Sequence, residues 1–180
     1  GLSGVTLVVG FDGLREQVEA QAGARPGMAA ALGGRQTTTL PPAAWTKLAA
    51  PARDAFGSPA AVMSLSVLPA AVSELMERGM DAARQRGLAS AWAAHAGVGA
   101  VTGALTAERE ASTVGAVLTE WRALARAAGG HATLVWAPLA VKSAVPVWED
   151  AGPAGRIMQR IKAQLDPNNV LNPGRFVAGI

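Results

Sequence analysis

The order of apolar patterns between residues 61 and 136 restricts the possible folds of this chain more than any other feature. An alternating, strand-like run at residues 61–68 is followed by one apolar helical face, made by Val72, Leu75, Met76, Gly79 and Ala83. Two more strand-like runs follow, at residues 88–95 and 98–105. The glycines between them, Gly97 and Gly99, are typical of a hairpin.

A further helix and strand complete this order. The apolar stripe of this helix consists of Val114, Val117, Leu118, Trp121, Leu124 and Ala128. The strand spans residues 131–136. A hairpin between two strand–helix units is not needed in a doubly wound sheet, so an antiparallel sheet with helices on one face is expected. The fold class that we predict is therefore α+β and ferredoxin-like.

Local signals predict where these elements begin and end. Pro69 suits the first turn of a helix that ends at Gly87, and Thr106 is the expected cap of the next helix, which closes at Gly129 and Gly130. Upstream, residues 4–11 predict a strand, followed by Asp12 as a cap and a helix that ends at Gly23. Residues 23–42 predict a loop, and residues 41–48 one or two helical turns.

The chain changes character after Pro138. Helical spacing returns only at Ile157, Ile161 and Leu165, before Asp166-Pro167 stops the helix. Residues 168–180 have no core of their own and need packing partners. We expect a single domain over residues 1–180, with the sheet and its helices in 1–137 and the C-terminal helix and tail in 138–180.

Composition excludes several classes of function. The 180 residues include no Cys, so thiolate metal sites, disulfides and cysteine nucleophiles are absent, and a reducing cytoplasm fits. The net charge of +3 comes without a basic cluster or any Tyr, which argues against nucleic acid. No apolar run approaches the ~20 residues of a membrane span. Because the chain begins with Gly, it is expected to be a piece of a longer protein.

The C-terminal residues 161–175, IKAQLDPNNVLNPGR, carry a specific resemblance. The helix, the Asp-Pro stop and the Asn-Pro-Gly turn together resemble the end of the FAD-linked oxidase C-terminal domain of vanillyl-alcohol oxidase-type flavoproteins. Residues 94–102 resemble the His-Ala-Gly-Asp-Gly-Asn-x-His segment of that family, and residues 7–11 its first cap strand. With Trp45 and Ala137-Pro138, the pattern looks most similar to the FAD-binding component of glycolate oxidase.

This resemblance implies the cap domain of a FAD-dependent oxidoreductase that oxidises a 2-hydroxy acid. It implies FAD in the full-length parent, held mainly by an N-terminal FAD-binding domain that this chain lacks, so no FAD is expected on the isolated, inactive fragment. The implied partners are that domain and other oxidase subunits, iron–sulfur subunits among them, with self-association through the uncovered docking face. The implied location is the cytoplasm, or the membrane periphery through a complex.

Two departures from the family pattern bear on catalysis. Val98 and Thr102 stand where the family segment has Asp and a second His. Neither side chain can bind a metal or act as an acid or base, so no metal site is expected. The departure favours a subunit that carries flavin and passes electrons over one that supplies the acid–base chemistry.

Six residues are candidates for a site. Asn172, Pro173 and Gly174 are the expected cofactor contact, with the Asn172 amide toward the flavin; an Asx-type turn that merely ends the fold is equally open. Lys142 and Arg175 are candidates for an anionic substrate, against the default of solvated cations. His95 is the candidate catalytic imidazole, against a hydrogen-bonded strand end.

A second class of function remains open at this point. A ferredoxin-like module could dimerise or bind a small ligand without redox chemistry. A third class, a free-standing hydrolase or transferase, finds no support, because no nucleophile, base and acid occur together in the motifs.

Overall fold

The computed structural model describes residues 5–34, 38–41, 43–44, 56–106 and 110–180. The chain divides into two compact units, Gly1–Thr46 and Lys47–Ile180. The expected boundary at residue 138 stays a prediction. Trp45 and most of the turn predicted at residues 41–48 lie outside the described residues.

The first unit contains one long helix, α1 (Arg15–Ala31). Residues 5–11 form no strand, contrary to the prediction, and Val5 and Leu7 are 97% and 82% exposed. A strand needs a neighbour for its backbone groups, and the described part of this unit supplies none. An apolar β-branched run alone was therefore an insufficient signal.

Both predicted ends of this first helix are wrong. The Asp12 carboxylate accepts a hydrogen bond from the adjacent Gly13 N–H at 2.9 Å and does not cap the helix, which begins at Arg15. The helix continues through Gly23, because the left-handed conformation that ends it falls on Gly33, with φ +80°. Residues 23–31 are thus helical and not part of a loop.

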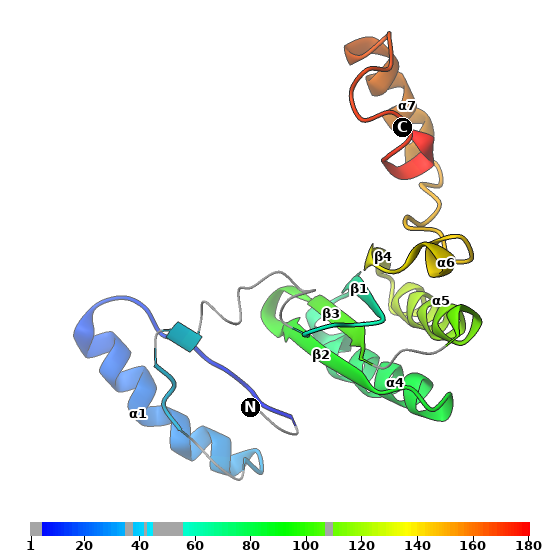
Figure 1. The fold of residues 1–180 in the computed structure, drawn as a ribbon. Coiled ribbons are helices and arrows are strands. Elements are labelled where there is room, and N and C mark those ends of the chain that lie inside the picture. Colours follow the sequence, from blue (N-terminus) through cyan, green and yellow to red (C-terminus); the bar gives the residue numbers. More distant parts are fainter. Residues whose placement is uncertain (1–4, 35–37, 42, 45–55, 107–109) are drawn as a thin grey trace. The chain divides into compact units, whose positions relative to one another are not determined.

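The second unit contains a four-stranded antiparallel sheet (Figure 1). Its strands are β1 (Ala61–Ser66), β2 (Ser90–His95), β3 (Ala100–Leu105) and β4 (His131–Trp136), in the spatial order β2-β3-β1-β4. Helix α4 (Val72–Gln85) connects β1 to β2, and α5 (Ala111–Ala127) connects β3 to β4. This is the predicted ferredoxin-like α+β fold, with two interleaved strand–helix–strand units. We call residues 61–136 the body.

The core of the body lies between α4, α5 and one face of the sheet. Trp121 is fully buried and donates from Nε1 to the Gly79 carbonyl at 2.8 Å. Its ring lies 4.4 Å from that of Trp92, centroid to centroid. Glycine is required beside this pair, since a Cβ at Gly79 would come within 2.5 Å of Trp92 and one at Gly103 within 2.8 Å of Trp121. The helices can therefore approach the sheet closely.

The turns of the body follow the predictions, with one exception. Pro69 opens a 3-10 turn, η1 (Pro69–Ala71), before α4, and Gly87 with φ +66° ends that helix. Gly99 closes the β2–β3 hairpin after η2 (Ala96–Val98), at φ +71° and so near the Val67 carbonyl that no side chain fits. Thr106 does not cap α5. That helix begins at Ala111 after Glu110, while the Thr106 N–H donates to the Ala89 carbonyl and extends the hairpin.

After the body, the chain forms α6 (Leu139–Lys142), α7 (Ala154–Leu165) and η3 (Val177–Gly179). Helix α7 ends at Asp166-Pro167, as predicted. We call residues 154–180 the C-terminal segment. None of the helices in the described ranges is both long and apolar enough to cross a bilayer.

Candidate functional site

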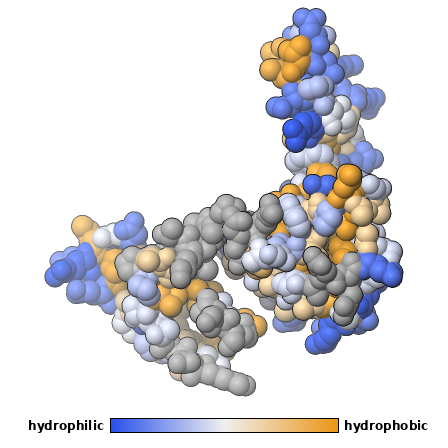
Figure 2. Space-filling view, viewed as in Figure 1, coloured by the Kyte–Doolittle hydropathy of each residue, from blue (hydrophilic) through white to orange (hydrophobic). Residues whose placement is uncertain are grey.

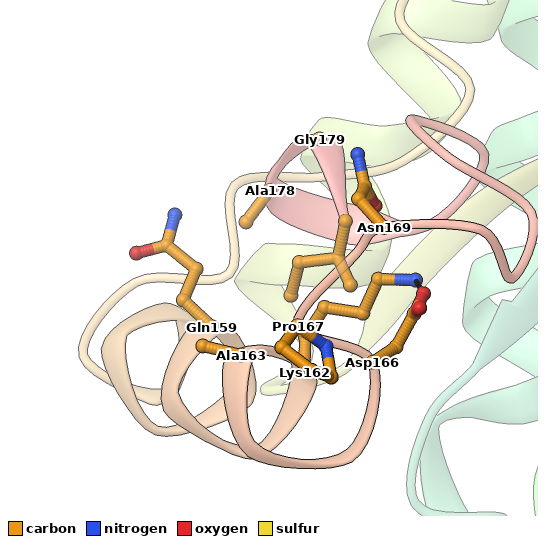
Figure 3. Close-up of a pocket in the computed structure, with 9 residues that line it drawn as sticks. Gln159, Lys162, Ala163, Asp166, Pro167, Asn169, Ala178 and Gly179 are labelled. Atoms are coloured by element: carbon orange, nitrogen blue, oxygen red, sulfur yellow. Dashed lines mark hydrogen bonds and ion pairs between the residues drawn. The ribbon is translucent and has the colours of Figure 1, made fainter.

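The best-defined polar cluster of the C-terminal segment is centred on the Asp166 carboxylate. Asp166 is 6% exposed, and its two oxygens accept hydrogen bonds from the backbone N–H groups of Val170 and Leu171, both at 2.9 Å. Lys162, one turn earlier on α7, donates to Asp166 at 2.5 Å and to the Leu171 carbonyl at 2.6 Å. We call Lys162, Asp166 and the two backbone groups the clamp. Figure 3 shows the Lys162 and Asp166 side chains directed toward each other.

The clamp stabilises the ionised form of Asp166. The hydrogen bond from Lys162, followed by those from the Leu171 and Val170 N–H groups, lowers the pKa of the carboxyl from 3.8 to about 2, although burial opposes the shift. The carboxylate is therefore charged at neutral pH. Its role is to hold the chain after α7 in place, since all its described partners lie in the C-terminal segment.

The clamp leads directly into the Asn-Pro-Gly turn. Asn172 has φ +47° and Gly174 φ +71°, and the Arg175 N–H donates to the Asn172 carbonyl at 3.2 Å. All three turn residues are exposed. Within the described residues the Asn172 amide makes no hydrogen bond, so the side chain does not close its own turn and is free for an outside partner.

The two candidate cations differ in their surroundings. Arg175 follows the turn; its carbonyl accepts a 3.3 Å hydrogen bond from the Trp148 indole, while its exposed guanidinium has no ion pair within the described ranges. Lys142 is exposed at the end of α6 and likewise unpaired there. No contact brings Lys142 together with the turn, so of the two cations only Arg175 lies beside it.

His95 lies away from these residues, at the end of β2. It is exposed and pairs with Ala100 of β3, which pairs with Ser66 of β1, which in turn pairs with His131 of β4. Both histidines therefore lie in one row across the sheet, on the face opposite α4 and α5. Three strand spacings separate them, roughly 14 Å, so they cannot share a metal ion. The described ranges contain no cluster of side chains suited to a metal.

A shallow hollow of about 280 Å³ lies between α7 and the end of the chain (Figure 3). Its lining includes Lys162, Asp166 and the last three residues, Ala178, Gly179 and Ile180. Both charged groups in the lining already bind each other in the clamp. Among its side chains, the hollow therefore offers a ligand only the uncharged amides of Gln159 and Asn169 as free polar groups.

Comparison with known proteins finds a family match in the C-terminal part of the chain. Residues 143–176 match the family of FAD linked oxidases, C-terminal domain. The match contains α7, the clamp and the Asn-Pro-Gly turn. No curated protein matches the chain. The match covers 34 of the 180 residues, and this segment is similar to the C-terminal domain of FAD-linked oxidases, enzymes that carry FAD. His95 lies outside the match, and so does Lys142.

Sequence reasoning found the turn but missed what holds it. Asp166 was predicted only as the stop of a helix, and Lys162 was given no role. A signal was present, because a Lys four residues before an Asp at a helix end can reach it. The assignments of Asn172, Pro173, Gly174, Arg175, Lys142 and His95 to flavin or substrate stay predictions.

Proposed function

We propose that this chain is the cap domain of a FAD-dependent oxidase or dehydrogenase that oxidises a 2-hydroxy acid such as glycolate, within a complex of several subunits. The observation that carries the proposal is the coincidence of the family match with the clamp. The clamp folds the matched residues so that the Asn-Pro-Gly turn is exposed. Within the described residues the Asn172 amide of that turn makes no hydrogen bond. A mere chain end would not need a buried carboxylate with three donors.

The residues of the turn suit an edge contact with FAD and not a complete binding site. The Asn172 side chain offers an NH2 group with two N–H donors and a carbonyl acceptor, with no internal competitor among the described residues. Pro173 and Gly174 restrict the backbone that presents it. When bound, FAD accepts the electrons removed from the substrate. The clamp would hold the amide at the flavin edge, while the pyrophosphate and adenosine would be bound by the N-terminal FAD-binding domain.

Arg175 is our preferred group for the carboxylate of the substrate. It is adjacent to the turn and its guanidinium is unpaired among the described residues, so a bidentate contact with a carboxylate is open to it. Lys142 is a second cation for the same role, and His95 the candidate acid–base group. With Val98 and Thr102 in the central segment, a role in carrying flavin and passing electrons fits the chain better than supply of the acid–base chemistry.

The surface of α7 supports docking of the FAD-binding domain. Ile157, Ile161 and Leu165 form a stripe along the helix and are 62%, 52% and 78% exposed. The tail packs on a different side of the helix, at Lys162 and Gly155. Figure 2 shows apolar surface within this otherwise hydrophilic part of the molecule. A partner domain covering the stripe would remove apolar area from water.

The experiment compares Asn172→Ala with Asn168→Ala, an exposed asparagine of the same tail, in the full-length parent protein. We expect Asn172→Ala to lower FAD occupancy or shift the flavin reduction potential, and Asn168→Ala to change neither. The thermal melt of the isolated chain should be unchanged by Asn168→Ala. Asn172→Ala should lower it only slightly, because the change breaks no internal hydrogen bond but places Ala at φ +47°. Normal flavin content with a destabilised chain would remove Asn172 from the cofactor site.

Substrate class is tested in the same preparation. Reduction of the flavin by glycolate, lost on Arg175→Ala and partly restored by Arg175→Lys, is the expected result. Iron–sulfur subunits that co-purify with the parent would support the proposed complex, which we place in the cytoplasm or at the membrane periphery.

One observation favours a second candidate function, a dimerisation or ligand-binding module without redox chemistry. Small exposed residues, Ser64, Ala93 and Ala100, lie on the sheet face away from the helices, and such a face suits a second sheet. Self-association of the isolated chain would persist in an Ile157→Ser/Ile161→Ser variant if it used the sheet, and disappear if it used α7.

A further inference from the structure

The link between the Asn-Pro-Gly turn and the body depends on two neighbouring residues, Trp148 and Glu149. Two contacts join Trp148 to the residues just after the turn. Its indole N–H donates to the Arg175 carbonyl at 3.3 Å, and its ring meets that of Phe176 edge to face at a centroid distance of 5.2 Å. The turn is thus held from one side by the clamp and from the other by Trp148.

Glu149 in turn fastens this part of the chain to the body. The Glu149 side chain is 14% exposed, and one of its oxygens accepts from the Ala132 N–H of β4 at 2.8 Å. The other oxygen accepts from Nε of Arg126 on α5 at 2.7 Å. The carboxylate therefore ties residue 149 to both a strand and a helix of the body.

The backbone before Glu149 follows the free edge of the sheet. The Leu134 N–H of β4 donates to the Val147 carbonyl at 2.9 Å, and Arg122 of α5 donates to the Pro146 carbonyl at 2.7 Å. The Leu134 bond uses an N–H group of an edge strand that would otherwise lack a partner. Burial lowers the pKa of the Arg122 guanidinium, and the nearby Glu149 carboxylate counteracts that effect. Residues 146–149 are consequently rigid support for Trp148.

We propose that Trp148 and Glu149 are positioning residues that hold the Asn-Pro-Gly turn at a fixed place relative to the sheet. The inference rests on the proposed function for its purpose, since a cofactor contact needs a fixed distance from the sheet. That Trp148 and Glu149 hold the turn in place follows from their contacts alone. Trp148 contributes little to the core, because it is 36% exposed and lies outside the buried cluster.

The absence of Cys allows a direct test on this chain. Single cysteines at Ala116, exposed on α5, and Val170, 72% exposed in the tail, accept spin labels without background. Pulsed dipolar spectroscopy then reports the distribution of distances between the body and the tail. We expect Trp148→Ala to widen this distribution roughly two-fold, as for a segment released from its anchor, with an unchanged thermal melt of the body.

Matched variants separate the contributions of the individual Trp148 and Glu149 contacts. Trp148→Phe keeps a ring beside Phe176 but loses the indole donor, so an intermediate width is expected, and Glu149→Gln should widen the distribution by releasing Arg126. Leu139→Ala, at a 79% exposed aliphatic residue of α6, is the control and should change nothing.

An unchanged distribution in Trp148→Ala would overturn the proposal. So would a loss of body stability that accounts for the widening, because Trp148 would then be part of the core. Neither result depends on flavin. Normal FAD content of Asn172→Ala would instead remove Asn172 from the cofactor site and leave the distance result intact.

Discussion

The body and the C-terminal segment bury opposite kinds of side chain. In the body, the buried residues are apolar, and the largest of them is Trp121, with no exposed surface. In the C-terminal segment, the residues that are buried are Gly155 and Asp166, while the neighbouring Leu165 is 78% exposed. The carboxylate that follows α7 is thus buried, while Ile157, Ile161 and Leu165 of the helix face outward. The body is a core that can stabilise itself, whereas the C-terminal segment is shaped by a few polar contacts and leaves its apolar face for another surface.

The largest effect expected from this contrast is that of Trp121→Ala. Loss of a fully buried indole and of its hydrogen bond to Gly79 should lower the free energy of unfolding by about 3–5 kcal/mol. Urea denaturation followed by circular dichroism measures it. The clamp should persist below the transition, seen as slow amide exchange of Val170 and Leu171. A loss of less than about 1 kcal/mol would show that the Trp121–Trp92 pair is not the centre of the core.

Asp166→Asn should have the opposite effect to Trp121→Ala: it should loosen the C-terminal segment and leave the body stable. The asparagine side chain is uncharged and has an NH2 donor in place of one acceptor oxygen. Lys162 and one of the two backbone N–H groups therefore lose their partner. We expect amide exchange at Val170 and Leu171 to accelerate by on the order of ten-fold, with little change in the melt of the body. Asp150→Asn, at an exposed carboxylate that accepts only from Gly152 N–H among the described groups, is the matched control. Equal exchange rates in both variants would show that the clamp is not what orders the tail.

The smallest of the three effects is expected when the solution is acidified and Asp166 becomes protonated. Because the pKa of Asp166 is lowered from 3.8 to about 2 in the folded chain, the stabilisation by its carboxylate is complete above about pH 4 and is lost as the pH falls toward 2. The Val170 and Leu171 amide resonances should shift over this interval in wild type and not in Asp166→Asn. A transition centred near pH 4 instead would mean that Lys162 and the two N–H groups do not favour the ionised carboxyl.

Several elements of the body were predictable because their signals are local. The alternation in β1, the apolar stripe of α5 and the glycines at 87, 99 and 129 each act through the conformation of the nearest residues. The same kind of signal failed for residues 5–11, where a strand would have required a partner elsewhere in the chain. It also failed at Thr106, whose backbone is used by the hairpin.

The residues of the candidate site likewise fall into those that local signals specify and those that only the tertiary structure places. The sequence alone determined the ferredoxin-like order of elements, the end of α7 and the Asn-Pro-Gly turn, since periodicity, proline and glycine act within a few residues. Only the tertiary structure decided that Asp166 lies inside, that His95 and His131 share a row of the sheet, and that Trp148 and Glu149 connect the tail to β4 and α5. These depend on strand register and on the direction of backbone N–H groups far apart in the chain, which no local pattern specifies.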